Sequence, residues 1–227
     1  SEAALRVGAG LVSVATRIEH SDALLARRPE VMVKGVQDKS DLASLIKRAT
    51  TLVVGPGLGQ SEWSKELMRT AIESKLPMII DADGLNLLAA GNLKIEFSVL
   101  TPHPGEAARL LDNGNIQEDR FAAIGKLQQK YGGVVLLKGV GTLVTNGEEI
   151  SLCPYGNPGM ATAGMGDVLS GIIGGLLAQG LSPYDAATQG AVIHALAGDL
   201  AAKESGERGL VATDLLPFVR ELVNAER

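Results

Sequence analysis

Short apolar runs alternate with helix-like segments over the first two thirds of the chain. The runs have apolar residues on both faces, which is typical of a strand buried within a sheet. The runs are Leu11–Val14, Leu52–Val54, Met78–Ile80, Val99–Leu100 and Val134–Leu137. The segments of helical composition between them are Ser61–Ser74, Gly84–Ala90, Gly105–Leu111 and Asp119–Tyr131. This alternation predicts an α/β fold with a largely parallel sheet wrapped by helices.

A hairpin pattern follows. Thr142–Thr145 and Ile150–Leu152 have the composition of strands, and the segment between them contains Asn146-Gly147. Asn-Gly is a strong signal for the tight turn of an antiparallel pair. We therefore expect these two strands to form an antiparallel hairpin at the edge of the sheet.

The last third of the chain has the pattern of helices. One buried face is predicted from apolar residues at helical spacing, which are Leu169, Ile172, Ile173, Leu176 and Leu177. The neighbouring glycines would let this helix pack closely. Start signals for two further helices are Ser182-Pro183, with a helix to about Ala202, and Thr213-Asp214.

Length and composition agree with one domain. The chain has 227 residues, 45% of them hydrophobic, and no linker divides it, so residues 1–227 are predicted to form a single domain. The helical pattern of Ala3–Gly8 leads straight into the first predicted strand. We therefore expect the domain to lack an N-terminal segment.

Charge and cysteine content exclude several classes of protein. The formal net charge of −5 argues against nucleic acid as a partner, because phosphate binding favours a basic face. No apolar run reaches the ~20 residues needed to span a bilayer, and no signal peptide is evident. Cys153 is the only cysteine, which excludes an internal disulfide and a cysteine-based zinc site. A reduced, cytoplasmic setting is expected.

The strongest candidate for a site is the glycine-rich segment from Asn157 to Asp167. It leads into a helix that is expected to start near Asp167, and the first amides of a helix lack partners within it and carry partial positive charge. Gly164 and Gly166 would let these amides converge on a phosphate or oxyanion. Asp167 is then either an ordinary helix cap or a base that deprotonates a hydroxyl attacking phosphate.

Three further loops follow predicted strands, where ligands collect in an open α/β sheet. Lys138-Gly139-Val140-Gly141-Thr142 is either a plain turn into the hairpin or a nucleotide-binding loop, with Lys138 near the phosphates. The loop Gly55–Gly59 is weaker evidence, and a turn is as good an explanation. His103 lies between two prolines, which favours a ligand contact over core packing. Glu106 is either a partner of the helix dipole or an indirect ligand of Mg²⁺ through water.

Other polar residues are less informative. Asp81, Asp83 and Asn86 follow the strand Met78–Ile80 and are expected to point to the same mouth as these loops. His194 is expected to be a core or interface histidine whose hydrogen bonds are satisfied, and Trp63 a packing residue. No spacing of histidine and carboxylates suggests a tight metal site.

Together these motifs carry a resemblance to one family. Ala3–Val12, Gly55–Gly59, Asp81–Asn86, Thr101–Glu106, Lys138–Thr142 and Asn157–Gly171 occur in that order, and the histidine loop with Gly164-Met165-Gly166-Asp167 makes the likeness specific. The chain resembles the ADP/ATP-dependent NAD(P)H-hydrate dehydratases over nearly its whole length. The resemblance implies a ribokinase-like three-layer α/β/α sandwich. It also implies repair of hydrated NADH and NADPH (NADHX and NADPHX) with ADP or ATP and Mg²⁺.

The same resemblance assigns roles to particular residues. It makes Asp167 the base at the substrate hydroxyl and Gly166 an AMP contact, with Gly139, Val140 and Gly141 between Lys138 and Thr142 in the AMP-binding stretch. His103, Gly57 and, less directly, Gly59 would contact the substrate together with Asp167. Family members form homo-oligomers, and many are fused to an NAD(P)H-hydrate epimerase domain.

Two other functions fit parts of the pattern. A kinase for a small alcohol, such as hydroxyethylthiazole or hydroxymethylpyrimidine, would share the anion hole and Asp167 but would leave a stable phosphorylated product. A nucleotide-binding module without catalysis would bind AMP or ADP with no turnover.

Overall fold

A six-stranded sheet forms the centre of the molecule in the computed structural model, which describes residues 1–91, 95, 97–112 and 114–224. Its strand order is β3-β4-β5-β6-β7-β8. The bounds are β3 Leu52–Val54, β4 Met78–Ile80, β5 Ser98–Leu100, β6 Val134–Leu137, β7 Thr142–Thr145 and β8 Ile150–Cys153. Neighbours from β3 to β6 are parallel, whereas β6–β7 and β7–β8 are antiparallel. The predicted parallel sheet with an antiparallel edge hairpin is therefore confirmed.

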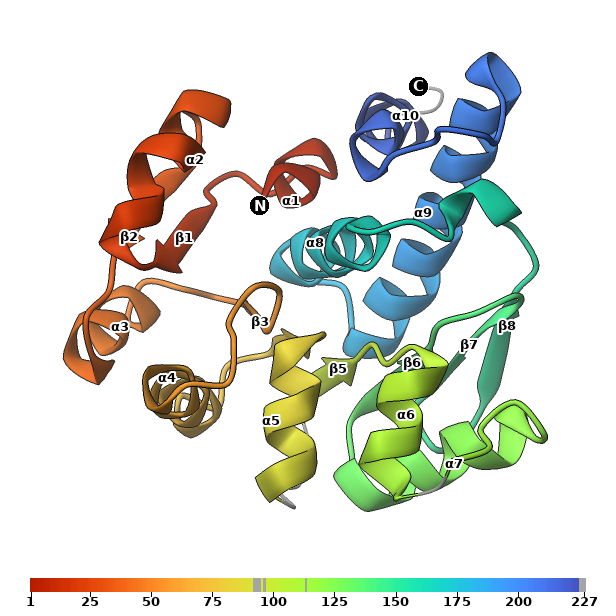
Figure 1. Ribbon diagram of the computed structural model, residues 1–227, viewed down its shortest axis with the longest axis horizontal. Helices are drawn as coiled ribbons and strands as arrows, with labels where there is room; N and C mark the ends of the chain where they lie inside the picture. Colours follow the sequence, from red (N-terminus) through yellow and green to blue (C-terminus); the bar gives the residue numbers. More distant parts are fainter. Residues whose placement is uncertain (92–94, 96, 113, 225–227) are drawn as a thin grey trace.

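Helices cover both faces of this sheet (Figure 1). One layer consists of α4 Glu62–Glu73, α5 Asp83–Gly91, α6 Pro104–Leu111 and α7 Arg120–Tyr131. The other consists of α1 Glu2–Arg6, α8 Met165–Ala178, α9 Pro183–Ser205 and α10 Leu215–Leu222. Successive side chains of a strand point to opposite layers: Ile79 packs in the core with α8 and α9, while Met78 and Ile80 pack in the core with α4–α7. This is the expected three-layer α/β/α sandwich.

Side-chain caps fix where several helices begin. Ser61 accepts a hydrogen bond from the Ser64 amide before α4, Asp119 from the Ala122 amide before α7, and Ser182 from the Asp185 amide before α9. An N-cap side chain satisfies an amide that the helix itself leaves free. Short 3₁₀ turns are Ile18–His20, Pro158–Met160 and Ala212–Asp214. Within the described ranges, no helix has both the length and the apolar character needed to cross a membrane.

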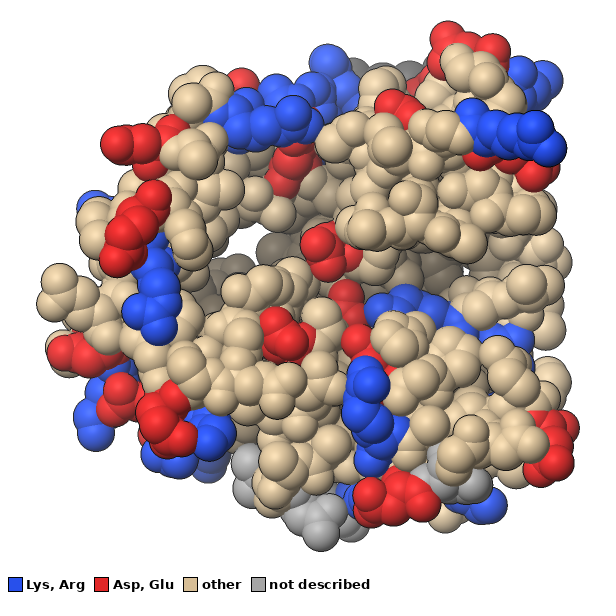
Figure 2. All heavy atoms as spheres, viewed as in Figure 1, with Lys and Arg blue, Asp and Glu red and all other residues tan. Residues whose placement is uncertain are grey.

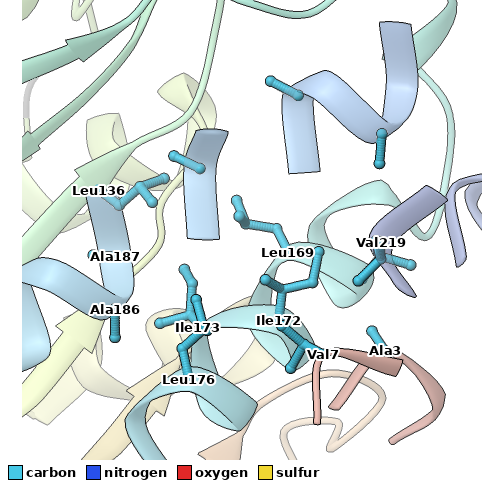
Figure 3. Close-up of a cluster of buried hydrophobic side chains, with 14 of the residues drawn as sticks. Ala3, Val7, Leu136, Leu169, Ile172, Ile173, Leu176, Ala186, Ala187 and Val219 are labelled. Atoms are coloured by element: carbon cyan, nitrogen blue, oxygen red, sulfur yellow. The ribbon is translucent and has the colours of Figure 1, made fainter. Parts of the chain in front are cut away.

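Helix α8 is buried almost all round rather than on the single face that its sequence predicts. Every residue from Val168 to Leu177 is buried, and Ile172 and Ile173 are fully so (Figure 3). Its glycines allow this, because a Cβ on Gly174 would lie 2.5 Å from Val53 and a Cβ on Gly175 only 2.2 Å from Val7.

The N-terminal segment, residues 13–50, departs from the prediction. It contains a separate two-stranded parallel sheet of β1 Ser13–Thr16 and β2 Met32–Gly35, with α2 Ser21–Arg27 and α3 Lys39–Ile46. The predicted buried strand Leu11–Val14 is wrong: the strand starts two residues later, and Leu11 is 81% exposed. An apolar run becomes a core strand only if both its faces are covered, and here the strand residues alternate between exposed and half-buried.

Candidate active site

The glycine-rich segment leads into the N-terminus of α8, as predicted. The helix begins at Met165, two residues before the expected start, and Gly164 is its N-cap with a positive φ of 86°. The Val168 amide bonds to the Gly164 carbonyl at 3.0 Å. The amides of Met165, Gly166 and Asp167 precede it and are the donors that a helix leaves free at its start.

Asp167 occupies the first turn of α8 but does not cap it. Its side chain is exposed and accepts no hydrogen bond from any described residue, and Gly164 is the cap. Although the residue is exposed overall, desolvation by the protein around its carboxyl raises the pKa of Asp167, and the negative charge of Asp81 raises it further. Lys138 and the N-terminal ammonium oppose this rise. The capping explanation is therefore wrong, and a free carboxylate with a raised pKa remains beside the helix amides.

A buried ion pair lies behind this helix end. Asp81 is 1% exposed, and its two oxygens accept from Lys138 Nζ at 2.8 Å and Ser170 Oγ at 2.7 Å. A Cβ on Gly166 would lie 3.2 Å from Lys138 Nζ. The lysine charge therefore lies against the start of α8, and glycine at 166 gives it room.

His103 and Glu106 form a capping box at the start of α6. His103 Nδ1 accepts from the Gly105 and Glu106 amides at 3.0 and 3.3 Å, and Glu106 Oε2 accepts from the His103 amide at 2.8 Å. Glu106 Oε2 also lies 3.7 Å from Lys138 Nζ. Glu106 thus acts as the partner of the helix start, the first of its two predicted roles. The His103 ring is half-exposed, and its Nε2 lies 3.5 Å from Glu106 Oε1.

Lys138–Thr142 forms the turn between β6 and β7. Gly139 and Gly141 have positive φ angles of 148° and 68°, a conformation that favours glycine. Thr142 Oγ1 donates to the Gly139 carbonyl at 3.2 Å, and the Val140 side chain at the tip is 99% exposed. The Lys138 side chain points away from this turn, toward Asp81 and Glu106.

The loop Gly55–Gly59 packs against the start of α5. A Cβ on Gly55 would lie 1.8 Å from the Asp81 carbonyl oxygen, and the Gly59 amide donates to Asp83 Oδ2 at 2.8 Å. Gly57 has a φ of 66° and open space around it. Asp81 and Asp83 thus each bond to one of the predicted loops, Asp81 to Lys138 and Asp83 to Gly59.

Asp167 also lines a cavity of about 260 Å³ between α8 and the N-terminal segment. Leu24 and Arg27 of α2 line it opposite Val168 and Thr213. Figure 2 shows an opening between the N-terminal segment and the part of the molecule that contains α8. The candidate base therefore faces a space large enough for a ring-sized group.

The structure adds residues that the sequence did not single out. Ser170 holds Asp81, and Asp199 of α9 accepts from the Gly156 amide at 3.0 Å and Asn157 Nδ2 at 2.9 Å. Arg120 donates to the Leu137 and Val140 carbonyls. The sequence signal for Asp199 is a carboxylate within an alanine-rich helix. The signal for Arg120 is a cation at the start of a helix, where the dipole favours negative charge.

The remaining candidates have other roles. Trp63 packs as predicted: Arg17 lies 4.4 Å from its ring centre, and its Nε1 donates to the Val36 carbonyl at 3.1 Å. His194 is a core histidine as predicted, but it is not fully satisfied: the Met165 backbone lies beside its ring, whereas its buried Nε2 has no close hydrogen-bond partner in the described part of the chain. Burial lowers the pKa of His194 to about 4.

The side chains do not form a cage for a resident metal ion. No cluster of three or more histidine, cysteine or carboxylate ligands occurs in the described ranges. Glu106, the predicted indirect ligand, already has its oxygens beside His103 and Lys138. A magnesium ion that entered here would have to bring most of its ligands, as waters and nucleotide phosphates.

Comparisons with known proteins agree on one family. A sequence model described as NAD(P)H-hydrate dehydratase matches residues 1–220. A bifunctional NAD(P)H-hydrate repair enzyme of Coxiella burnetii is 56% identical over 99% of this chain, which spans 46% of that protein. An ADP-dependent (S)-NAD(P)H-hydrate dehydratase of Neisseria meningitidis is 39% identical over 89% of this chain and 71% of its own. The ADP/ATP-dependent NAD(P)H-hydrate dehydratase of Bacillus subtilis, co-crystallized with ATP/Mg²⁺, superposes with a TM-score of 0.82 at 25% identity, covering 98% of this chain and 82% of that one.

Proposed function

Because this chain belongs to the NAD(P)H-hydrate dehydratase family, we propose that it restores NADH and NADPH from their hydrates at the expense of ADP or ATP. The observation that carries the proposal is the exposed Asp167 carboxylate beside the first amides of α8, with the Lys138 charge behind them. A base and an anion hole are what transfer of a phosphoryl group to a hydroxyl requires.

The reaction follows from the chemistry of the leaving group. Asp167 takes the proton of the hydrate's hydroxyl as its oxygen attacks the terminal phosphorus of ADP, and the bond from phosphorus to AMP breaks. Phosphate then leaves with the electron pair of its bond to the ring carbon, and a proton leaves the neighbouring carbon to restore the double bond. Phosphate is a far better leaving group than hydroxide, which is why a nucleotide is consumed. With ATP the other product is ADP.

In this proposal, different loops bind the two substrates. Lys138, Gly139, Val140, Gly141, Thr142 and Gly166 would bind the nucleotide, and Gly57, Gly59 and His103 the hydrate. The free amides at α8, the positive φ angles of the β6–β7 turn and the open space at Gly57 support this division. Mg²⁺ would enter on the nucleotide phosphates, in keeping with the relative crystallised with ATP/Mg²⁺.

We also propose that residues 1–227 act as the dehydratase domain, in a cytoplasmic homo-oligomer. The Coxiella relative, of which this chain spans 46%, is named as bifunctional. A share of 46% is what we expect if the dehydratase domain makes up about half of a protein that also contains an epimerase domain.

The decisive experiment supplies hydrated NADH with ADP or with ATP and follows the return of the dihydronicotinamide absorbance. We expect recovery that depends on the nucleotide, with one phosphate released per NADH formed. A stable phosphorylated alcohol would instead identify a kinase. Nucleotide binding without turnover would identify a non-catalytic module.

A further inference from the structure

Two carbonyls of the turn Lys138–Thr142, and the Leu137 carbonyl just before it, accept hydrogen bonds from side chains, while three amides of the turn donate none. The Leu137 and Val140 carbonyls accept from Arg120, and the Gly139 carbonyl accepts from Thr142 Oγ1. No described residue accepts a hydrogen bond from the amides of Gly139, Val140 or Gly141. Consecutive free amides form a concavity that suits an anion.

Two of these three carbonyl bonds come from one side chain in another element. Arg120, the first residue of α7, donates from Nη1 to Val140 at 2.5 Å and from Nη2 to Leu137 at 3.2 Å. Its guanidinium also packs on the backbone of the turn, since a Cβ on Gly139 would lie 3.0 Å from Nη2. The planar fork of arginine presents several donors in a fixed geometry, whereas the ammonium of lysine is a single point at the end of a flexible stem.

The position of Arg120 is costly unless it serves this turn. A cation in the first turn of a helix is repelled by the helix dipole. Nothing among the described residues offsets this, because no carboxylate pairs with Arg120 and its buried Nε has no partner. Burial accordingly lowers the pKa of this guanidinium. The carbonyls of Leu137 and Val140 are therefore the groups that accept hydrogen bonds from this charge, directly behind the free amides.

We propose that Arg120 is a positioning residue for the nucleotide: it holds the carbonyls of the turn so that the amides of Gly139, Val140 and Gly141 face the phosphates of a nucleoside diphosphate. This inference rests on the proposed function, which assigns the turn to the nucleotide. It assigns a role to Arg120, which lies outside the motif Lys138–Thr142. It also predicts that a change at Arg120 affects binding of the nucleotide and not of the hydrate.

The test compares Arg120→Gln and Arg120→Lys with Arg109→Gln, a control on an exposed arginine of α6. Calorimetry would give the Kd of ADP, and steady-state rates would give KM for ADP and for hydrated NADH. We expect Arg120→Gln to raise the Kd of ADP by about 10- to 100-fold. The KM for hydrated NADH and the Tm should stay near the values of Arg109→Gln. Arg120→Lys should recover part of the loss, because it keeps the charge but lacks the fixed fork that reaches both carbonyls.

Other results would overturn the inference. Unchanged ADP affinity in Arg120→Gln, or equal losses for both substrates with a lowered Tm, would leave Arg120 a structural residue only. If the wild-type protein binds ADP but does not dehydrate the hydrate, the proposed function fails while the ADP affinities still decide the role of Arg120. A wild-type protein that binds neither ADP nor ATP would contradict both.

Discussion

At the scale of single residues, Asp167 differs from Asp185, a carboxylate at the matching position of another helix. Asp185 occupies the same third position after its cap in α9, but its Oδ2 accepts from Ser182 Oγ at 2.6 Å. Asp167 has the position without the bond. A carboxylate left free in this way is available to take a proton from a ligand.

The first prediction uses this matched pair. Asp167→Asn should lower turnover by about 10²- to 10⁴-fold with ADP binding mostly kept, because the amide cannot accept the hydroxyl proton. Asp185→Asn removes the same charge from the same helical position and should leave turnover near that of the wild type. Initial rates of NADH recovery and calorimetry with ADP would measure both. Near-normal turnover in Asp167→Asn would remove this residue from the mechanism.

The second prediction concerns pH. Asp167 acts as a base only when ionised, so activity should fall as the pH drops through its pKa, which burial and the negative charge of Asp81 raise. Asp81→Asn removes that charge, so the pKa should fall and the acid limb of kcat should move to lower pH. Ser170→Ala keeps the charge and removes only a hydrogen bond to Asp81. Its acid limb should stay in place, and an unmoved limb in Asp81→Asn would contradict the coupling.

The residues that sequence could and could not identify differ in a physical way. Gly166, Asp167 and Lys138 stand in short motifs that the sequence offers as candidates, with a cap or a plain turn as the alternative, and the family resemblance selects them. Arg120 and Asp199 act on loops that lie 17 and 42 residues away in the chain. Such contacts arise only when the sheet brings distant segments together. Local pattern therefore identifies candidate residues within a motif better than the distant residues that hold the motif in place.

At the scale of elements, prediction succeeded where both ends of an element had a signal. Helix α4 lies within Ser61–Ser74 because Ser61 caps it, and β7 matches Thr142–Thr145 because the Asn-Gly turn fixes its register. The helices α2 and α3 have no buried residue, so they offered no apolar stripe to recognise. Their strand partner β2 was missed for the same reason, since its positions alternate between exposed and half-buried.

The third prediction tests the close packing of α8. Gly175→Ala should destabilise the fold by about 1–3 kcal/mol, because the added methyl would lie 2.2 Å from Val7 and 3.0 Å from the Ala4 carbonyl oxygen. Gly125 lies inside α7 with nothing within 4 Å of its Cβ position. Gly125→Ala should therefore stabilise by about 0.4–1 kcal/mol through helix propensity and a smaller loss of backbone entropy. Urea denaturation measures both, and effects of the same sign would contradict the packing argument.

At the scale of the whole molecule, the two sheets differ in how they are buried. Every residue of β4, β5 and β6 is buried between helix layers, whereas β1 and β2 have no buried residue. Within the N-terminal segment the buried hydrophobic residues are Val31 and Val36, both outside its strands. The sequence pattern of Leu11–Val14 is as apolar as that of the core strands, so the difference depends on which segments cover it.

This difference in burial predicts that the molecule opens in parts. Little apolar area is exposed when the N-terminal segment detaches, so its strands should open by a local step that costs less free energy than global unfolding. In native-state hydrogen exchange, the amides of β1 and β2 should exchange at least about tenfold faster than those of β4 and β5. Low urea should speed exchange in β4 and β5 more than in β1 and β2, because only the larger opening exposes the core. Equal protection and an equal urea response in the two sheets would mean that the N-terminal segment unfolds together with the sandwich. Because this segment provides one wall of the cavity at Asp167, added ADP and hydrate should slow its exchange if the cavity closes around the bound substrate.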